Sequence, residues 1–360
     1  MTLNILKKIF LLFLILLLAP FLTGCINVQI SGQDGGVFRS SDKGETWQQV
    51  VFTERIKKKK TKTISHVNVT QMVFNPLDSR IIYLATKENG AFFSESKGEK
   101  WSPLLTIRGE VKAIAPDPES KNIIYLTTGQ KILKTTDQGR EWYQIYLETK
   151  LGHFITCLAI DPLNPNKIYA GISDGRLIRS FDAGKSWKII HDFQAHIKQI
   201  LINEKNPQII YLATASSGIF KTTDSGQNWQ EITKDLEVNY PGIKNFKIAI
   251  LDQTKTDALM IATQHGLLKT NDGGRNWQPL KLLTQPGTIT IYSLALNPKN
   301  SQEIYYGTAR TLYKSTDGGL TWITKSLPTK RVAFFLLVDP YDPKIVFLGA
   351  TKIKNQQNLR

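Results

Sequence analysis

Cysteine is nearly absent from this sequence, with two residues among 360, so a fold held together by disulfide bonds is excluded. Proline and glycine, at 15 and 25 residues, are too few for a collagen-like or low-complexity chain. Acidic residues are also scarce, because Asp and Glu number 30 against 46 Lys and Arg. Hydrophobic residues make up 41% of the chain, which is enough to bury a core. We therefore expect a basic globular protein.

The N-terminus has the composition of a secretion signal. Lys7 and Lys8 precede an unbroken apolar run over residues 9–22, which is too short to span a bilayer comfortably as a helix of the folded protein. The run closes with Leu22-Thr23-Gly24-Cys25, which resembles the bacterial lipobox, where the cysteine is acylated. We expect residues 1–24 to be a lipoprotein signal peptide, Cys25 to carry lipid and residues 25–34 to form a short tether. The protein would then be exported and lipid-anchored on the extracytoplasmic face of a membrane; a plain N-terminal anchor is the alternative.

The body of the chain is a repeat that becomes visible when its seven tryptophans are aligned. Each Trp ends a motif of Ser or Thr, any residue, Asp, any residue, Gly, two residues and Trp. Successive tryptophans are 54, 41, 45, 42, 48 and 45 residues apart, which is the period of a four-stranded propeller blade. One copy departs, since it has Ser96 in place of the Asp. The motif residues are Asp42 and Trp47, Ser96 and Trp101, Asp137 and Trp142, Asp182 and Trp187, Asp224 and Trp229, Asp272 and Trp277, and Asp317 and Trp322.

Each repeat also supplies the other strands of a blade. An apolar inner strand comes first, as in residues 111–115 or 292–296, and a second follows, as in residues 81–86 or 304–308. A short third strand leads into the motif, and the Trp opens the fourth. No apolar pattern of 3.6-residue period is present in the mature chain, which argues against helices.

The two ends of the repeat region complement each other. The first motif hairpin, residues 37–50, has no inner strands before it, whereas residues 332–338 and 344–350 form two strands with no motif after them. We therefore predict an all-β, seven-bladed β-propeller over residues 35–351, with four-stranded blades, closed by the N-terminal hairpin joining the C-terminal blade. Residues 352–360 would be a polar tail, and we expect a monomer.

The motif residues resemble those of the Asp-box (BNR-type) propeller superfamily, which includes the sortilin ectodomain, bacterial sialidases, xyloglucan-cleaving glycosidases and the photosystem II assembly factor family. Seven blades, a single-domain length and a lipobox are most similar to the photosystem II assembly factor type. In the motif we expect Asp to accept N–H groups within the turn, Gly to permit positive φ, and Trp to wedge between sheets. These roles are structural rather than catalytic.

Enzymatic signatures are missing from the sequence. Arg55-Ile56-Lys57 is the nearest string to the Arg-Ile-Pro signature of sialidases, and a xyloglucanase-like site would place paired carboxylates between two propellers, whereas this chain has room for one. The five histidines lack metal-ligand spacing, and Cys157, in an apolar strand, is a buried structural thiol. We therefore predict no enzyme, no cofactor and no metal site.

Basic residues form two patterns. Arg55, Lys57, Lys58, Lys59, Lys60 and Lys62 lie in the longest interval between tryptophans, where we expect an inserted, solvated loop that either docks to anionic lipid or an acidic partner or serves only as a solubilising face. Six cations directly precede the first Ser or Thr of a motif, and they form either an open positive ring or stems that cover the outer strands. They are Arg39, Lys134, Arg179, Lys221, Lys269 and Lys314, with Phe93 at the seventh position.

Two functions are compatible with these features. The first is a membrane-tethered, exported, non-catalytic propeller that binds a protein partner, acidic or membrane-embedded, as an assembly or stability factor for a membrane complex. The alternative is an exported carbohydrate-binding or glycoside hydrolase propeller. Exposed aromatics beside paired carboxylates on one rim would favour the alternative. Nucleic acid is not an expected partner, because an exported lipoprotein does not meet it and no base-reading motif is present.

Overall fold

The computed structural model describes residues 34–57, 60–244 and 246–353. The predicted signal peptide, Cys25, the tether up to residue 33 and the tail from residue 354 lie outside the described residues. The chain from Asp34 onward forms one compact unit.

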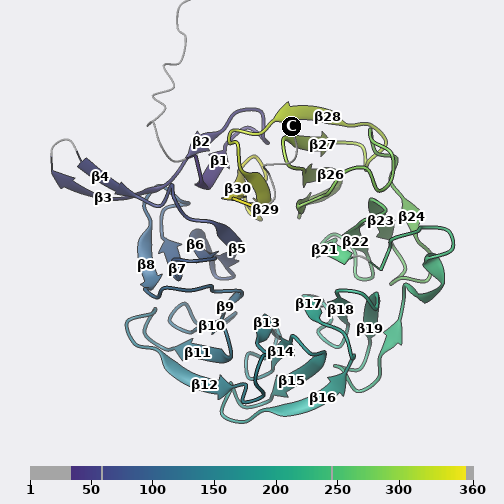
Figure 1. Cartoon of the computed structure of the whole chain (residues 1–360), viewed down its shortest axis with the longest axis horizontal. Helices are drawn as coiled ribbons and strands as arrows, with labels where there is room; N and C mark the ends of the chain where they lie inside the picture. Colours follow the sequence, from purple (N-terminus) through teal and green to yellow (C-terminus); the bar gives the residue numbers. More distant parts are fainter. Residues whose placement is uncertain (1–33, 58–59, 245, 354–360) are drawn as a thin grey trace, which may run out of the picture. The chain divides into compact units, whose positions relative to one another are not determined.

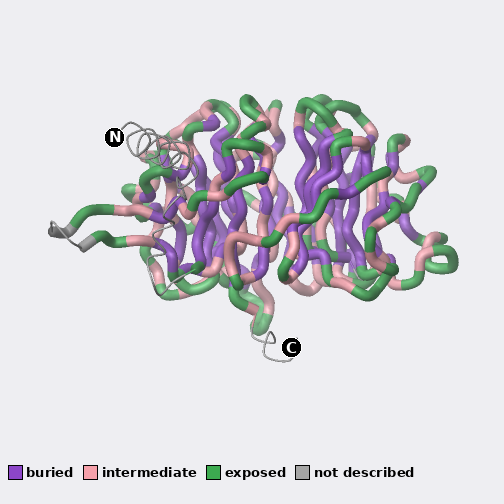
Figure 2. The backbone as a smooth tube through the Cα atoms, turned by 90° about the horizontal axis from the view of Figure 1, so that it is seen from above, coloured by how far each residue is buried: buried purple, intermediate pink, exposed green. Residues whose placement is uncertain are grey.

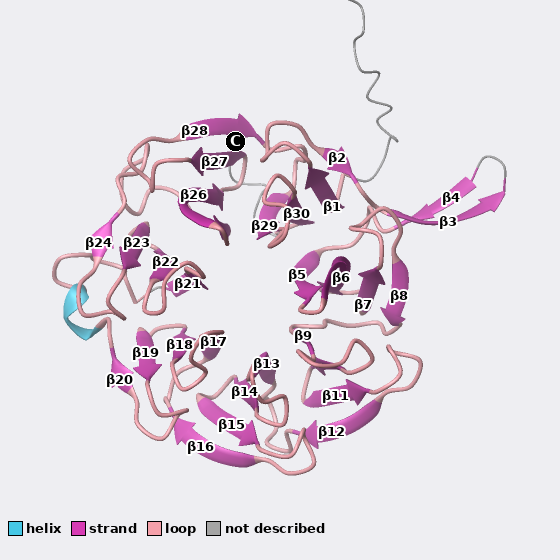
Figure 3. Ribbon diagram, turned by 180° about the vertical axis from the view of Figure 1, so that it is seen from behind, coloured by secondary structure: helices cyan, strands magenta, loops and turns pink. Residues whose placement is uncertain are grey.

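Seven four-stranded antiparallel sheets are arranged in a ring (Figures 1 and 3), which confirms the predicted seven-bladed propeller. From the centre outward, blade 1 consists of β5 (Val69–Asn75), β6 (Asp78–Thr86), β7 (Ala91–Ser94) and β8 (Ser102–Leu105). Blade 2 consists of β9 (Ile114–Pro116), β10 (Ile124–Thr128), β11 (Lys131–Thr135) and β12 (Tyr143–Leu147). Blade 3 consists of β13 (Ile155–Ile160), β14 (Ile168–Ile172), β15 (Arg176–Ser180) and β16 (Lys188–Asp192). Blade 4 consists of β17 (Ile197–Ile202), β18 (Ile210–Thr214), β19 (Ile219–Thr222) and β20 (Gln230–Glu231). Blade 5 consists of β21 (Phe246–Leu251), β22 (Leu259–Thr263), β23 (Leu267–Thr270) and β24 (Gln278–Pro279). Blade 6 consists of β25 (Ser293–Asn297), β26 (Asn300–Gly307), β27 (Thr311–Ser315) and β28 (Ile323–Ser326).

Blade 7 is built from both ends of the described chain. Its strand order is β2-β1-β30-β29, where β1 is Gly36–Ser40, β2 is Gln48–Gln49, β29 is Val332–Val338 and β30 is Val346–Thr351. Strand β1 pairs antiparallel with β30, and Phe38 lies opposite Leu348. The predicted closure is confirmed, and it leaves neither β1 nor β30 with an unpaired edge.

The core lies between the blades, because each sheet packs its two faces against its neighbours. Every residue of β14, β18, β22 and β30 is buried, whereas most residues of the outer strands β12, β16 and β28 are exposed or half-buried. Figure 2 shows this change from a buried interior to exposed turns. Second strands therefore read as continuous apolar runs, and outer strands as polar ones.

Two local features differ from the sequence-based expectation. The basic insertion is not a loop but a two-stranded hairpin, β3 (Phe52–Lys57) and β4 (Lys60–Thr63), which projects from the ring (Figures 1 and 3). Its strands pair Glu54 with Lys62, so opposite charges face each other and reduce the repulsion that favoured a loop. A 3₁₀ turn also occurs at Lys234–Leu236. Across the part of the chain that the structure describes, no helix is long and apolar enough to cross a membrane.

Candidate functional site

The repeated motif builds a turn in which the aspartate is fully engaged. In blade 3, Ser180 Oγ donates to Asp182 Oδ1 at 2.8 Å, and the N–H and Oγ of Ser186 donate to Asp182 Oδ1 and Oδ2 at 2.8 and 2.6 Å. The hydrogen bonds from Ser186 and Ser180 lower the pKa of Asp182 to about 2. A carboxylate that is ionised and hydrogen-bonded in this way holds the turn, so its role is structural.

The residue after each aspartate ties the turn to its own blade. In blade 3 this is Ala183, whose φ is +57°, and its N–H donates to the carbonyl of Asn166 at 3.0 Å. The left-handed conformation turns this peptide toward the start of the second strand. The equivalent donors and acceptors in the other blades are Lys43 and Lys344, Lys97 and Arg80, Gln138 and Asn122, Ser225 and Gln208, Gly273 and Asp257, and Gly318 and Gln302.

The tryptophans lie between sheets. Trp101 is 1% exposed, and its Nε1 donates to the carbonyl of Val50 at 2.9 Å, in the preceding blade. Trp142, Trp277 and Trp322 donate in the same way to Leu104, Ile232 and Lys281. Trp187 and Trp229 instead bond to glycine carbonyls of their own turns.

The six periodic cations do not form a free positive ring, because each one crosses to the next blade. The amine of Lys134 donates to the carbonyl of Ala183 at 3.1 Å, and Arg179, Lys269 and Arg39 donate to the equivalent carbonyls of Ser225, Gly318 and Lys97. Lys221 and Lys314 pair with Asp257 and Glu45. Most of them also lie over a tyrosine ring of the second strand, as Lys134 does over Tyr125 at 5.1 Å. We call the contact between such a cation and the next blade the inter-blade cation bridge.

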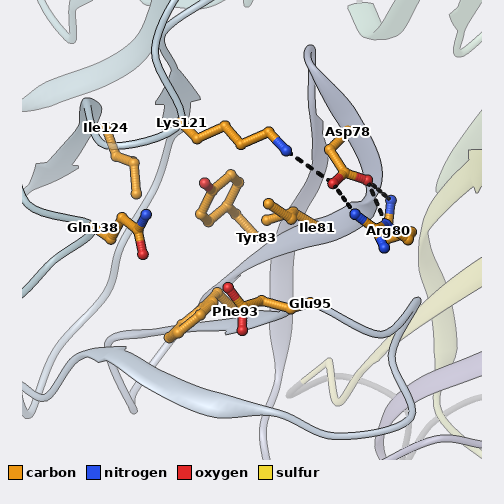
Figure 4. A pocket seen from close by; sticks show the side chains of 9 residues that line it. All are labelled: Asp78, Arg80, Ile81, Tyr83, Phe93, Glu95, Lys121, Ile124 and Gln138. Carbon is orange, nitrogen blue, oxygen red and sulfur yellow. Dashed lines mark hydrogen bonds and ion pairs between the residues drawn. The ribbon is translucent and has the colours of Figure 1, made fainter.

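Blade 1 lacks the cation bridge. Phe93 takes the place of the cation, Ser96 replaces the aspartate, and Glu95 stands between them where the other copies carry a neutral residue. Phe93 has no donor for Gln138, which is the blade 2 counterpart of Ala183. A pocket of about 280 Å³ opens at this junction (Figure 4), at the lower end of the volumes of ligand sites. It is lined by Asp78, Arg80, Ile81, Tyr83, Phe93, Glu95, Lys121, Ile124 and Gln138.

One carboxylate of the pocket is a fixed anion. Asp78 accepts hydrogen bonds from Arg80 Nε and Nη2 at 3.0 and 2.8 Å, and from Lys121 Nζ of blade 2 at 3.0 Å. The bonds from Arg80 and then Lys121 hold the pKa of Asp78 well below its usual range. Asp78 is therefore ionised at any physiological pH and joins blades 1 and 2 at the mouth of the pocket.

The second carboxylate lies beside aromatic rings. Glu95 is exposed, and its charge, added to burial, raises the pKa of the Tyr83 hydroxyl. Figure 4 shows Tyr83 and Ile81 between Lys121 on one side and Phe93 with Glu95 on the other. Two carboxylates, two aromatic side chains, a guanidinium and an amide thus converge on one small pocket, which is a composition suited to a hydroxyl-rich ligand such as a sugar ring.

Other residues singled out in the sequence have simpler positions. Cys157 is buried, and burial raises the pKa of its thiol to about 11, so it is a structural thiol. Arg55 and Lys62 of the basic hairpin are exposed, and Lys62 pairs with Glu54. The side chains of Lys57 and Lys60, and the whole of Lys58 and Lys59, lie outside what the structure describes. Among the residues that the structure describes, no group of three or more His, Cys, Asp or Glu side chains could hold a metal ion.

Sequence reasoning missed Asp78, Tyr83 and Glu95. The signal was present, since the blade 1 motif departs at three of four consecutive positions, 93, 95 and 96. Only the Ser96 and Phe93 departures were noticed, and Asp78 looks like an ordinary turn residue until Lys121 of the next blade reaches it.

Fold and site together define a seven-bladed propeller with repeated aspartate turns and a pocket of about 280 Å³ at the one junction, among the described residues, without a cation bridge. Residues 175–281 match the family model described as Sortilin, neurotensin receptor 3. The chain is 31% identical over 147 residues to the xyloglucanase Xgh74A of Acetivibrio thermocellus, a match that covers 34% of this chain and 17% of that enzyme.

Solved structures share the fold. The GH74 xyloglucanase from Xanthomonas campestris superposes with a TM-score of 0.65 at 17% identity, over 85% of this chain and 52% of the enzyme. YCF48 from Cyanidioschyzon merolae gives a TM-score of 0.61 at 13% identity, over 79% of this chain and 96% of YCF48. The chain thus spans about half the length of the xyloglucanase structure. The expected resemblance to sortilin-type and photosystem II assembly factor propellers is confirmed.

Two expectations about function are wrong in the light of these relatives. The chain was expected to be a non-catalytic propeller that binds a protein partner, and not to be an enzyme, but the curated relatives that match it are xyloglucanases. They support the alternative, an exported carbohydrate-binding or glycoside hydrolase propeller. The sequence-based argument considered paired carboxylates only between two propellers and did not weigh a site within a single ring.

Proposed function

We propose that this protein is an exported propeller that binds and hydrolyses β-glucan chains of the xyloglucan class, with the blade 1–blade 2 pocket as its sugar site. The observation that carries the proposal is the pocket at the junction where Phe93 stands in place of the bridging cation, because it contains two carboxylates and two aromatic side chains. The xyloglucanase relatives supply the substrate class. Because the match covers a small part of those enzymes, the activity is a proposal for this chain.

The two carboxylates have different roles in this mechanism. Glycoside hydrolysis needs a proton for the departing oxygen and a negative charge that stabilises the positive charge developing on the sugar ring. Asp78 stays ionised but is already paired with Arg80 and Lys121, so its role is to hold these two cations at the mouth of the pocket, where their remaining N–H groups bind sugar hydroxyls. The negative charge near the sugar is that of the Glu95 carboxylate once it has given up its proton. Glu95 donates its proton to the departing oxygen as the glycosidic bond breaks, and the water that then adds to the sugar carbon gives a proton back to the Glu95 carboxylate.

The location of the protein follows the same proposal. A polysaccharide substrate lies outside the cell, and the xyloglucanase relatives agree with an exported protein. The finer part, a lipid anchor on Cys25, rests on the Leu22-Thr23-Gly24-Cys25 sequence. Such an anchor would keep the propeller at the membrane where released oligosaccharides are taken up.

The proposal is tested by incubating the protein with tamarind-type xyloglucan and measuring new reducing ends. We expect Glu95→Gln and Asp78→Asn each to lower the rate by about 100-fold or more, the range for loss of an acid catalyst or a fixed charge in a site. Glu99→Gln, which changes an exposed carboxylate in the same turn, is the matched control and should leave the rate unchanged. Folding of each variant is checked by its thermal unfolding curve. No hydrolysis by the wild-type protein, or equal rates for wild type and Glu95→Gln, would overturn the proposal.

A further inference from the structure

The face of the ring opposite the aspartate turns is bordered by the first residues of the innermost strands. Each blade's first and third strands run in the same direction, and the third strand ends in the aspartate turn. The starts of the first strands β5, β13, β17, β21 and β29 therefore lie on the other face, around the axis of the ring (Figure 1).

A β-bulge marks the same position in five of these strands. The register shifts between residues 69 and 71, 155 and 157, 197 and 199, 246 and 248, and 333 and 335. A bulge leaves one residue unpaired and re-aims its side chain, and bulges are common next to functional sites. Two of the five bulged residues are Lys198 and Lys247, and Lys112 holds the same position in the repeat of blade 2.

These three lysines form a cluster with one histidine. We call Lys112, His196, Lys198 and Lys247 the inner basic rim. Burial and the charge of Lys247 lower the pKa of Lys198, and burial together with Lys112 and Lys198 lowers the pKa of His196. The groups therefore repel one another across blades 2 to 5. Lys198 is shielded at its amine, where it meets the Phe246 carbonyl, while the rest of its side chain and Lys247 are open to solvent.

Little negative charge compensates the rim. Glu110 is 3.4 Å from Lys112, and among the ion pairs of the described residues it is the one carboxylate paired with a member of the rim. The side chain of His196 is hydrogen-bonded to the backbone of Ser173. The next residue, Asp174, already forms ion pairs with Arg176 at 2.9 Å and with Lys150 at 3.2 Å.

An aromatic ring joins the basic groups. The ammonium group of Lys112 lies 4.5 Å from the centre of the Phe154 ring, and the ring centres of Phe154 and His196 are 5.9 Å apart in an edge-to-face arrangement. Lys198 Nζ reaches the backbone carbonyl of Phe246 in the next blade at 2.9 Å. The rim is thus an ordered surface rather than a set of independent lysines.

We propose that the inner basic rim binds an acidic glycan, with the carboxylates of uronic acid residues lying against Lys112, Lys198 and Lys247. Bound carboxylates would relieve the repulsion within the rim, and Phe154 offers an apolar ring edge for a sugar. Blades 2, 4 and 5 place the three lysines along an arc that a chain of sugars can follow. The assignment of a glycan, rather than another anion, rests on the proposed function.

The experiment compares binding of polygalacturonate, polyglutamate and neutral xyloglucan to the full chain at low and high salt. We expect the wild type to bind polygalacturonate more tightly than polyglutamate. The triple variant Lys112→Gln/Lys198→Gln/Lys247→Gln should bind polygalacturonate about tenfold or more weakly, and its binding should depend less on salt. The control replaces three exposed outer-strand or surface lysines, Lys131, Lys188 and Lys205, with Gln and should change binding little.

The outcomes separate this inference from the proposed function. Loss of polygalacturonate binding in the rim variant, with xyloglucan hydrolysis retained, supports the rim as a second site. Equal loss in the control variant, or polyglutamate bound as tightly as polygalacturonate, overturns it. Failure of xyloglucan hydrolysis in the wild type bears on the blade 1–blade 2 pocket alone, because the rim lies on the opposite face.

Discussion

At the scale of single residues, one substitution removes the cation bridge from a blade junction. A cation at the position of Phe93 reaches the next turn and covers a tyrosine ring, as Lys134 does with Ala183 and Tyr125. Phenylalanine fills part of the same space but donates no hydrogen bond. Phe93 lines the pocket at this junction, and Glu95 adds charge where the other motifs are neutral.

Phe93→Lys should close the pocket. The new amine is expected to reach the carbonyl of Gln138, adding about 1 kcal/mol to the free energy of unfolding, the usual worth of one hydrogen bond. Xyloglucan binding should be lost, because the lysine occupies the sugar space. Both quantities are measured, by urea denaturation and by isothermal titration.

The reciprocal change is the control for this prediction. Lys134→Phe removes the bridge to Ala183 at 3.1 Å and should lower the free energy of unfolding by a similar amount without affecting xyloglucan binding. Unchanged xyloglucan binding by Phe93→Lys would show that the sugar lies elsewhere.

At the scale of elements, closure of the ring depends on strand β1. It pairs with β30 on one side and with β2 on the other, through five and two residue pairs respectively. The neighbouring basic hairpin β3–β4 pairs only with itself. The two elements adjoin in sequence but contribute differently, since one completes a sheet and the other projects from the ring.

Deleting residues 37–50 should expose β30 as an unpaired edge and cause aggregation. Deleting residues 54–62, which removes most of the projecting hairpin, should leave a soluble protein with nearly unchanged thermal stability. Size-exclusion chromatography and thermal unfolding distinguish the two. A monomeric 37–50 deletion variant with the wild-type melting temperature would contradict the requirement for closure by the N-terminus.

At the scale of the whole molecule, the aspartate turns act together on stability against acid. The pKa of Asp182, Asp272 and Asp317 is lowered to about 2 by hydrogen bonds within the turns, chiefly from Ser186, Asn276 and Thr321 respectively. A carboxyl whose folded pKa lies below its ordinary value near 3.8 stabilises the fold above that value. The stabilisation is lost as the pH falls from about 4 toward 2.

The melting temperature should therefore fall steeply between pH 4 and pH 2. Asp182→Asn and Asp317→Asn, introduced together, should flatten this fall, because two of the linked carboxyls no longer titrate. Asp192→Asn, an exposed aspartate on an outer strand outside the turns, is the control and should leave the slope unchanged. A melting temperature independent of pH from 4 to 2 in the wild type would contradict this role of the turns.

The amino-acid sequence by itself determined the ring. Seven tryptophans at blade spacing, apolar second strands and unmatched half-blades at the two ends fix the number of blades and their closure, because these patterns are local or periodic. The strand ends differ by only a few residues, as at β6, which begins at Asp78 where the sequence predicted residue 81.

Tertiary structure alone decided what the surface does. Whether a lysine forms a free positive ring or a bridge depends on a carbonyl about 49 residues away, as for Lys134 and Ala183. The blade 1–blade 2 pocket needs Asp78 and Lys121, which are 43 residues apart, and the inner basic rim needs lysines from three blades. Charged side chains interact through space, so the packing of the blades decides which groups they meet. The repeat of the tryptophan motif, in contrast, can be seen in the order of residues along the chain.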